Sequence, residues 1–388
     1  MITKLHLVNW KSFKDSTVYI DPLTFLIGTN ASGKSNVLDA FLFLHLLMKG
    51  QTLEDAAAGI RGGEDWIIRK GQTWFELAVT IEKNELEYEY VIHVQRDDIG
   101  LSFLENDIYV SSKNTTKKTY LDTDRTLDVS TNLYLNVEKT LPNQDSKTVI
   151  SAVRDTLKSI FVLNPDPQAM RRYSKLSKEL RMDAGNIAGV LAALKAEEKE
   201  LLEEKLTKYV KPLPERDINK IKAVTVGLTG TDAMLYCYED WNPDVPVDAR
   251  GMSDGTLRFT AIIVSLLTLK PGSLLIIEEV DNGLHPSRAR ELVKVLKEIS
   301  AERQIDVLCT THNPVLMDEL GNGMIPFISF VKRDKQGNSY IQLLEDKENL
   351  AKLMASGTVG DMNLRQWRLN LEEGDNKNLS EHCCRLRC

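Results

Sequence analysis

One glycine-rich segment of the sequence has the spacing needed to hold phosphates. Residues Gly28 to Ser35 read Gly-Thr-Asn-Ala-Ser-Gly-Lys-Ser, which matches the G-x-x-x-x-G-K-[ST] pattern of a P-loop. An apolar run precedes the segment and an apolar helical stretch follows it, which is the strand, loop and helix context that a P-loop requires. Backbone N–H groups and the helix N-terminus of such a loop bind phosphate oxygens, and Lys34 adds a positive charge. The segment therefore predicts nucleotide binding.

The loop residues divide into nucleotide contacts and a magnesium ligand. Ser35 directly follows the lysine, where its hydroxyl is placed to ligate Mg²⁺. A fortuitous glycine-rich turn is the alternative, and the agreement between pattern and context argues against it. The predicted nucleotide contacts are Asn30, Ala31, Ser32, Gly33, Lys34, Ser35 and Asn36.

Two adjacent carboxylates follow a second buried strand. Residues 274–277 read Leu-Leu-Ile-Ile and end in Glu278 and Glu279, and ligands of open α/β sheets bind at the carboxyl ends of the strands. We assign Glu278 to Mg²⁺ and Glu279 to the orientation or deprotonation of the attacking water. Because side chains alternate along a strand, both carboxylates serve one site only if the chain turns where the strand ends. A solvated acidic loop is the alternative.

A histidine is predicted at the same sheet edge. His312 follows the apolar strand 307–310, where it would hydrogen-bond the γ-phosphate or the attacking water. A lone histidine after a strand is more often a structural side chain, but its position after the carboxylate strand favours a catalytic role. We therefore predict Glu279 and His312 as the catalytic pair.

A second anion site is predicted at the start of another helix, and it suggests that two subunits bind one nucleotide together. The segment Met252-Ser253-Asp254-Gly255-Thr256, called the signature segment below, precedes the apolar stretch 257–269. The Ser253 hydroxyl and the Gly255 N–H therefore lie at a helix N-terminus, where they can contact phosphate. An ordinary N-cap is the alternative. One nucleotide needs only one phosphate cradle, so a second cradle suggests that the phosphates are covered by another subunit.

The elements that must position these residues are strands alternating with helices, which implies a largely parallel α/β sheet. Predicted strands cover residues 5–20, 23–27, 233–238, 274–277 and 307–310, a β-hairpin covers 74–94, and helices cover 36–48 and follow Gly255 and Pro286. Residues 148–210 carry a leucine stripe among Glu and Lys and are interpreted as helical throughout.

We divide the chain into five segments. They are an N-terminal head part with the P-loop (1–95), a β-rich variable extension (96–145), a helical insertion (146–215), a C-terminal head part with the signature segment, Glu278, Glu279 and His312 (216–345), and a C-terminal helix with a polar tail (346–388).

Composition limits the classes of function. A formal net charge of -7 argues against a uniformly basic nucleic-acid coat, although a local cationic patch remains compatible with it. Five cysteines without framework spacing fit a reducing compartment. The polar N-terminus and short apolar runs predict neither a signal peptide nor a membrane span, so we expect a cytoplasmic protein.

Together these motifs resemble the heads of ABC-type ATPases. The P-loop, signature segment, Glu278-Glu279 pair and His312 have the order and approximate spacing of such heads. The opening residues 7–13 resemble the SMC and RecF branch, and residues 281–286 resemble its RecF-like and OLD-like members. The resemblance covers residues 1–95 and 180–345. It implies a P-loop NTPase fold with a mixed, largely parallel sheet, a β-rich N-terminal lobe and a helical insertion.

The resemblance also implies an activity and its partners. It implies ATP and Mg²⁺ as cofactors, ATP hydrolysis, and a homodimer or higher even-numbered oligomer in which Ser253 and Gly255 of one head reach the γ-phosphate held by another. Nucleotide state would then be coupled to DNA or to a protein effector such as a nuclease or toxin, as in bacterial defence against phage, with no membrane partner. An ATP-sensing scaffold with little turnover and a RecF-like DNA-repair ATPase are the alternatives.

Several features fit the resemblance less well. Asp254 stands where transport ATPases have glycine, so its charge must point away from the phosphates or be offset, and Glu278 stands where aspartate is commoner. Gln72 is a weak candidate for the glutamine that links heads to partners. Arg171, Lys175, Lys178 and Arg181 are predicted on one side of a helix, as a DNA-binding face or, more simply, a solvated one. Asp122 with Asp124, and His382 with Cys383, Cys384 and Cys388, lack the supporting pattern of a metal site.

Overall fold

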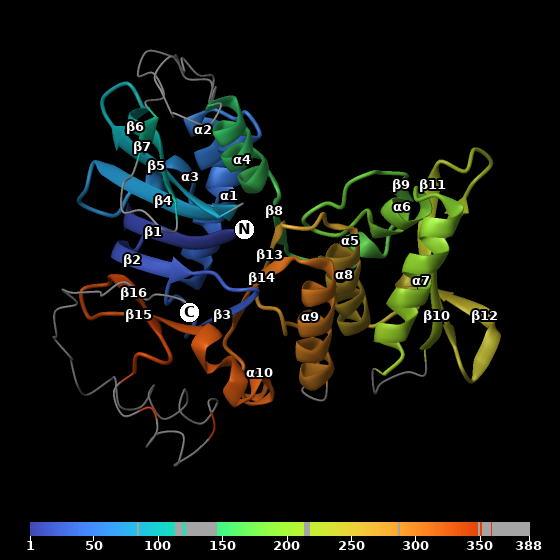
Figure 1. Cartoon of the computed structure of the whole chain (residues 1–388). Helices are drawn as coiled ribbons and strands as arrows, with labels where there is room; N and C mark the ends of the chain where they lie inside the picture. The colour runs from blue at the N-terminus through green and yellow to red at the C-terminus, as the bar shows by residue number, and fades with distance from the viewer. Residues whose placement is uncertain are drawn as a thin grey trace.

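A mixed β-sheet forms the centre of the protein. The computed structural model describes residues 1–83, 85–112, 119–121, 146–212, 218–285 and 288–347, together with residues 350 and 358. Within these residues the main sheet has twelve strands in the order β7-β6-β5-β4-β1-β2-β16-β15-β3-β14-β13-β8 (Figure 1). This mixed α/β architecture confirms the predicted fold class.

The sheet has an antiparallel wing and a parallel half. The wing consists of β7 (Thr119–Leu121), β6 (Leu101–Ser112), β5 (Leu86–Arg96), β4 (Trp74–Lys83), β1 (Ile2–Trp10) and β2 (Phe13–Tyr19). The other half consists of β16 (Ser339–Leu343), β15 (Ile328–Arg333), β3 (Leu23–Ile27), β14 (Asp306–Thr311), β13 (Leu274–Ile277) and β8 (Ile160–Leu163). From β15 to β8 all neighbouring strands are parallel, so their carboxyl ends share one edge.

Side-chain alternation in the parallel half fills a core on each face of the sheet. Phe25 and Ile27 of β3 join the core that contains α8 and α9, whereas Leu26 joins the core that contains α1. The helices of the α1 side are α1 (Lys34–Met48), α2 (Leu53–Ala58), α3 (Gly63–Ile67) and α4 (Ser146–Lys158). The helices of the other side are α8 (Asp254–Thr268), α9 (Ala289–Arg303) and α10 (Pro314–Leu320), followed by the 3-10 helix η3 (Asn322–Phe327).

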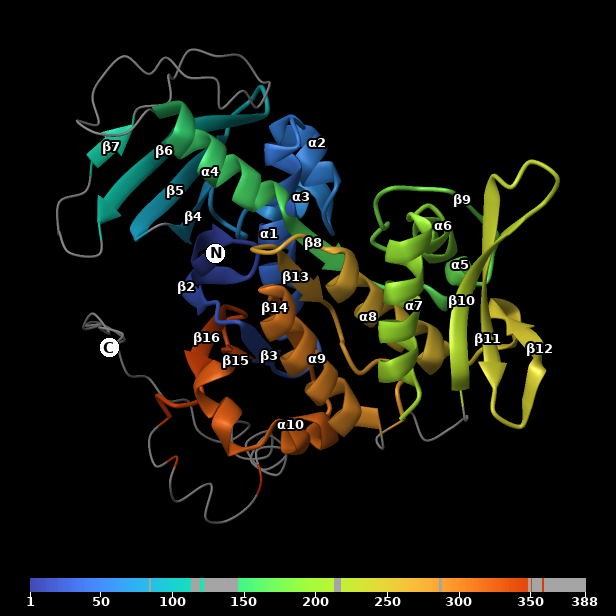
Figure 2. The same ribbon diagram turned by 45° about the vertical axis from the view of Figure 1, so that its right-hand side comes forward.

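A second lobe lies beyond α8 and α9, on the side away from the antiparallel wing (Figures 1 and 2). It contains the antiparallel strands β10 (Ile218–Val226), β11 (Asp232–Glu239) and β12 (Asn242–Asp248), with the short β9 (Ser174–Lys175) paired to β11. Its helices are α5 (Pro167–Met170), α6 (Ile187–Ala192), α7 (Ala196–Val210) and the 3-10 helix η1 (Ala249–Gly251). This lobe ends directly before the signature segment.

The structure corrects the prediction that residues 148–210 are helical throughout. Strand β8 pairs in parallel with β13, so it belongs to the main sheet and not to a helical insertion. Its sequence, Ile-Phe-Val-Leu, is a short apolar run whose periodicity does not distinguish a strand from a buried helix. Strand β11, predicted near 233–238 as part of the parallel core, lies in the antiparallel lobe instead.

Three further differences concern boundaries. The predicted strand 5–20 is a hairpin, β1 and β2, with Lys11 in the left-handed region (φ +49°) at the turn. Strands β6 and β7 fall in the predicted β-rich extension, while residues 122–145, including Asp122 and Asp124, lie outside the described residues. The same holds for the tail after residue 358 with its histidine and three cysteines. None of the described helices is both long and apolar enough to cross a bilayer.

Asp306, at the start of β14, makes the stability of this sheet depend on pH. Its side chain is buried and its Oδ1 has no hydrogen-bond partner among the described residues. Burial raises the pKa of Asp306 to about 7, although the positive N-terminus of Met1 opposes the rise. Between about pH 4 and pH 7 the unfolded chain has therefore lost this proton while the folded protein retains it, so raising the pH favours unfolding.

We expect Asp306→Asn to become increasingly stabilising relative to the wild type as pH rises. The gain should approach about 1 kcal/mol per pH unit between about pH 5 and pH 7 and then level off. Urea unfolding at a series of pH values measures it. Asp98→Asn, at an exposed position, is the matched control, and a difference that stays constant with pH would contradict the assignment.

Candidate functional site: a phosphate loop facing two carboxylates

The P-loop connects β3 to α1 and is packed tightly against β15 and β16. A Cβ atom added to Gly28 would lie 2.3 Å from the Val331 carbonyl oxygen, so only glycine fits there. Gly33 adopts a φ of +117°, which residues other than glycine rarely adopt. Both glycines of the sequence pattern are thus required by backbone geometry.

Two polar groups inside the loop are suited to a polyphosphate. The Lys34 ammonium donates to the carbonyl oxygens of Gly28 (2.7 Å) and Thr29 (2.8 Å), so its charge lies within the loop. Burial lowers the pKa of Lys34, while the nearby Glu279 and Glu278 counteract that change. The buried Ser32 Oγ has no hydrogen-bond partner among the described residues. A buried hydroxyl without a partner is costly, and a phosphate oxygen would satisfy it.

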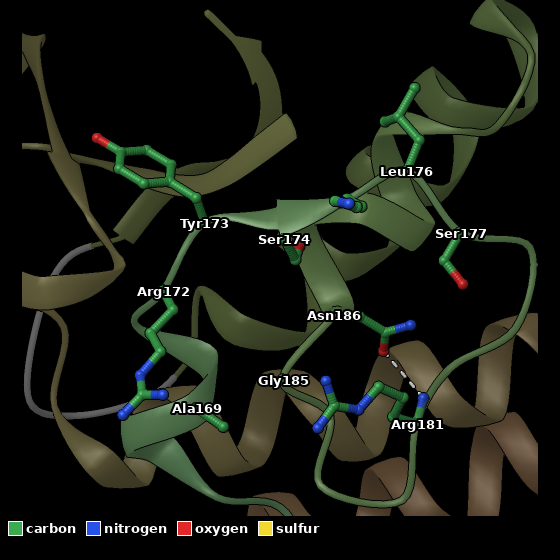
Figure 3. Close-up of a pocket in the computed structure, with 10 residues that line it drawn as sticks. Ala169, Arg172, Tyr173, Ser174, Leu176, Ser177, Arg181, Gly185 and Asn186 are labelled. Atoms are coloured by element: carbon green, nitrogen blue, oxygen red, sulfur yellow. Dashed lines mark hydrogen bonds between the residues drawn. The ribbon is translucent and has the colours of Figure 1, made fainter. Parts of the chain in front are cut away.

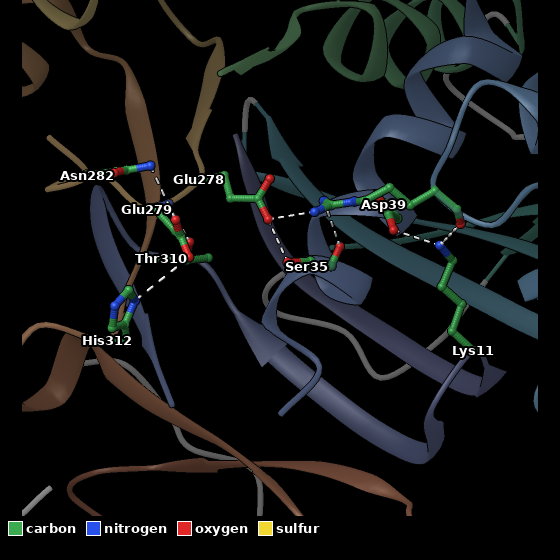
Figure 4. A network of polar contacts seen from close by, with 9 residues as sticks. Lys11, Ser35, Asp39, Glu278, Glu279, Asn282, Thr310 and His312 are labelled. Atoms are coloured by element: carbon green, nitrogen blue, oxygen red, sulfur yellow. Dashed lines mark hydrogen bonds and ion pairs between the residues drawn. The ribbon is translucent and has the colours of Figure 1, made fainter. Parts of the chain in front are cut away.

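The predicted magnesium ligands meet at the end of the loop. The Ser35 hydroxyl donates to Oε1 of Glu278 at 2.5 Å, although the two residues are 243 positions apart in sequence (Figure 4). Both side chains offer oxygen atoms, which Mg²⁺ prefers as ligands. Ser35 and Glu278 therefore fit a magnesium ion, which would neutralise charge on the phosphates of a bound nucleotide.

Arg61 is a site residue that the sequence analysis missed. Its Nη1 donates to the same Glu278 oxygen at 2.6 Å, and its Nε donates to Asp39 at 3.1 Å. The buried Lys11 ammonium donates to the other Asp39 oxygen at 2.6 Å. Burial lowers the pKa of Arg61, but the carboxylates of Glu278 and Asp39 outweigh it and raise that pKa overall. This chain of charges connects the β1–β2 turn with the predicted magnesium ligands.

The strand that ends in two carboxylates turns sharply after the first of them. Glu279 has a φ of +46°, and its N–H donates to Thr310 Oγ1 of the neighbouring strand β14 at 2.8 Å. The turn required for both carboxylates to serve one site is therefore present. Glu279 Oε1 lies 3.8 Å from His312 Nδ1, so the two predicted catalytic side chains face each other (Figure 4).

The signature segment is placed away from this cluster. Ser253 is the N-cap of α8 and its Oγ accepts from the Thr256 N–H at 3.1 Å. A Cβ added to Gly255 would lie 2.8 Å from the Gly283 carbonyl oxygen, in the turn that follows Glu279, and equally close to the buried Arg288. Within the described residues neither Ser253 nor Gly255 hydrogen-bonds the P-loop, Glu278 or Glu279. The predicted second anion site therefore packs against the turn that follows Glu279, but no hydrogen bond among the described residues connects it to the P-loop.

Arg171 offsets the unusual aspartate of the signature segment. Its Nη2 pairs with Asp254 Oδ1 at 2.5 Å and also donates to the Met252 carbonyl oxygen at 2.9 Å. The prediction of one helix with four cations on one side is wrong, because α5 ends at Met170 and β9 follows. Pairing of β9 with β11, a long-range contact, overrides the local helical spacing.

Other predicted site residues have more ordinary surroundings. Asn30 and Ala31 are exposed on the loop. The Asn36 amide donates to Ser12 Oγ at 2.7 Å and thus faces the β1–β2 turn. Gln72 is exposed before β4, and no hydrogen bond among the described residues connects it to the P-loop or to either carboxylate. No group of three or more potential metal-binding side chains occurs in the described part of the chain.

The fold, together with a P-loop that faces a strand ending in two carboxylates, defines a P-loop NTPase with an ABC-type, SMC-like head. A family model described as "AAA domain, putative AbiEii toxin, Type IV TA system" matches residues 23–318, well over half of the chain. The chain therefore belongs to this family of AAA ATPase domains.

Solved SMC heads have the same fold. An SmcHead bound to the C-winged helix domain of ScpA is similar with a TM-score of 0.55 and 17% identity, over 88% of this chain and 96% of that one. The Smc head domain with an extended coiled coil bound to the C-terminal domain of ScpA, derived from Pyrococcus furiosus, gives 0.54 and 13%, over 91% and 99%. At these identities the likeness shows the fold alone. No curated protein matches the sequence significantly.

Proposed function

We propose that this protein binds ATP with Mg²⁺ and hydrolyses it between two heads. The observation that carries the proposal is the 2.5 Å contact between Ser35 Oγ and Glu278 Oε1, beside a P-loop whose Ser32 hydroxyl has no partner among the described residues. These groups, together with Lys34, form a cradle for a triphosphate and its metal ion.

The residues around the cradle would each act on a definite atom. Glu279 accepts a proton from the attacking water as its oxygen bonds to the γ-phosphorus, and the bond from that phosphorus to the bridging oxygen of ADP breaks. His312, facing Glu279, donates a hydrogen bond to the γ-phosphate or to the water. Lys34 stabilises the charge that develops on the transferred group.

The signature segment supports a dimer around ATP. Ser253 and Gly255 present a hydroxyl and an N–H at the start of a fifteen-residue helix, yet within the described residues neither of them hydrogen-bonds the P-loop of its own chain. A second head supplies the complementary phosphate surface, and loss of the γ-phosphate on hydrolysis weakens the interface. The assembly would be a homodimer or a higher even-numbered oligomer.

A substitution that keeps the helix cap but adds charge tests the dimer. In Ser253→Asp, the aspartate still caps α8 but repels the γ-phosphate of the opposite head. We expect the wild type to form dimers with ATP and Mg²⁺ in sedimentation experiments, Ser253→Thr to retain them, and Ser253→Asp to remain monomeric. A wild type that stays monomeric with saturating ATP, even when its turnover is blocked, would refute the dimer.

A protein effector is the partner that we favour. The description of the matching family names a toxin system, and the two SMC heads were solved with a bound ScpA domain. By analogy, we propose that nucleotide state here controls a nuclease or toxin, as in defence against phage. A DNA-repair role is less favoured, because one of the cations assigned to DNA, Arg171, is paired with Asp254.

A further inference from the structure

A basic pocket lies beside the signature segment, separate from the P-loop. It has a volume of about 460 Å³ and is formed between the end of α5, strand β9 and the start of α6 (Figure 3). Three cationic side chains line it, namely Arg172, Lys175 and Arg181, together with Tyr173 and the hydroxyl groups of Ser174 and Ser177. Neither the P-loop nor the carboxylate strand contributes to it.

The pocket is positively charged although the chain as a whole is acidic. The net charge is -7, yet no carboxylate of the described residues pairs with Arg172 or Lys175. Arg181 is paired with Asp183 at 2.5 Å, but 65% of its side chain remains exposed. Arg172 and Lys175 thus place two positive charges without a carboxylate partner among the described residues beside one cavity, and an anion inside it would be attracted to both.

The backbone that carries these cations is fixed by short contacts. The Ser174 hydroxyl accepts from the Gly189 N–H at 2.9 Å, and the buried Asn186 accepts from the Arg181 N–H at 2.9 Å. A Cβ on Gly189 would lie 2.0 Å from the Lys175 carbonyl oxygen, so this close approach requires glycine. A fixed framework lowers the entropic cost of holding a ligand. The backbone around the cavity is therefore fixed, while the three cationic side chains that it carries are exposed at the cavity surface.

Size and chemistry together indicate the class of ligand. A cavity of about 460 Å³ falls in the range typical of small-molecule sites, whereas a nucleic-acid duplex requires an extended surface. Tyr173 at the edge of the pocket is 55% exposed and its ring points away from Ser174 and Arg181 (Figure 3), so the cations and not the ring indicate the class of ligand. We propose that this pocket is a second nucleotide-sized site, which binds a phosphate-bearing small molecule through Arg172, Lys175 and Arg181.

Arg171 links the pocket to the signature segment. Arg171 immediately precedes Arg172 and holds both Asp254 and the Met252 carbonyl oxygen. A ligand that draws Arg172 into the cavity therefore acts on the residue that orients the start of α8. This regulatory part of the proposal, in which a ligand in the pocket acts on the signature segment, rests on the proposed function, whereas binding in the pocket does not.

Equilibrium dialysis with radiolabelled ADP on the full chain tests the binding. Lys34→Ala weakens the P-loop site, so retained ADP binding that depends on Arg172 and Lys175 identifies the pocket. Adding Arg172→Glu and Lys175→Glu to that variant should weaken the remaining binding at least about tenfold. The matched control adds Lys195→Glu and Lys211→Glu, two exposed lysines of the same lobe outside the pocket, and should keep it. Inorganic pyrophosphate in excess should displace the retained ADP.

Three outcomes would overturn the second site. They are a Lys34→Ala protein that binds no ADP, retained binding after both charge reversals, and failure of pyrophosphate to compete. These outcomes do not depend on hydrolysis: if the wild type releases no phosphate while Lys34→Ala still binds ADP, only the proposed function fails. The regulatory part predicts that the two reversals in the otherwise wild-type chain alter phosphate release at least about threefold, and an unchanged rate removes it.

Discussion

Replacing Glu279 with glutamine is expected to slow phosphate release at least about 100-fold, because glutamine cannot accept the proton of the attacking water. The change preserves the size of the side chain. The turn at Glu279 should also persist, since it depends on the main-chain N–H that donates to Thr310. Affinity for ATP should therefore stay within about threefold of the wild type, as expected when an interaction is lost only in the transition state. Steady-state phosphate release and equilibrium ATP binding measure the two effects separately.

The same variant distinguishes an ATPase from an ATP-sensing scaffold. Because ATP binds but is not cleaved, Glu279→Gln should accumulate dimers that last longer than those of the wild type. Glu197→Gln, at an exposed position on α7, removes the same charge far from the cluster and should change neither quantity. Unchanged phosphate release in Glu279→Gln would remove this residue from its role, and negligible release by the wild type would favour the scaffold.

The fold class and the local motifs were predictable because each depends on short-range pattern. The P-loop, the strand 274–277 and the helix start at Ser253 are each one continuous stretch of sequence. The hydrogen-bonding needs of each stretch follow from a few adjacent residues. Even the turn at Glu279 was anticipated, as the only way for two neighbouring carboxylates to serve one site. Pairing between the strands that carry these motifs then follows from their shared parallel order.

Contacts between distant residues were not predictable in the same way. Arg61 belongs to a glycine-flanked turn without a recognisable pattern, and only the folded chain brings it to Glu278, 217 positions away. Arg171 was interpreted as part of a solvated helix face, whereas pairing across 83 positions makes it the counter-charge of Asp254. One sequence contains no information on which opposite charges meet, so these two assignments needed the structure.

Arg61 affects how the predicted magnesium ligand Glu278 could bind a metal ion. Its guanidinium and the Ser35 hydroxyl both donate to one oxygen of Glu278, so that carboxylate is already neutralised by a cation. Coordination of Mg²⁺ by Glu278 would place two cations on one carboxylate, a repulsion that the phosphates of a nucleotide would offset. Metal and nucleotide should consequently bind together more strongly than either does alone.

Lys34 is expected to dominate nucleotide affinity. In Lys34→Ala the phosphates lose a partly buried positive charge, and losses of this kind cost about 2–5 kcal/mol, which corresponds to a fall in ATP affinity of roughly 30-fold to several thousand-fold. The substitution also removes the donor that bridges the carbonyl oxygens of Gly28 and Thr29, so the loop itself should become less ordered.

Calorimetric titration with ATP and Mg²⁺, at protein concentrations high enough to detect weakened binding, measures the loss at the P-loop. Lys49→Ala is the matched control, because Lys49 is exposed at the opposite end of α1 and removes the same charge from the same helix. Glu279→Gln should bind ATP without cleaving it, whereas Lys34→Ala should do neither well, so the two variants assign binding and chemistry to different residues. A P-loop affinity that falls less than about threefold in Lys34→Ala would be inconsistent with a lysine that carries most of the charge facing the phosphates.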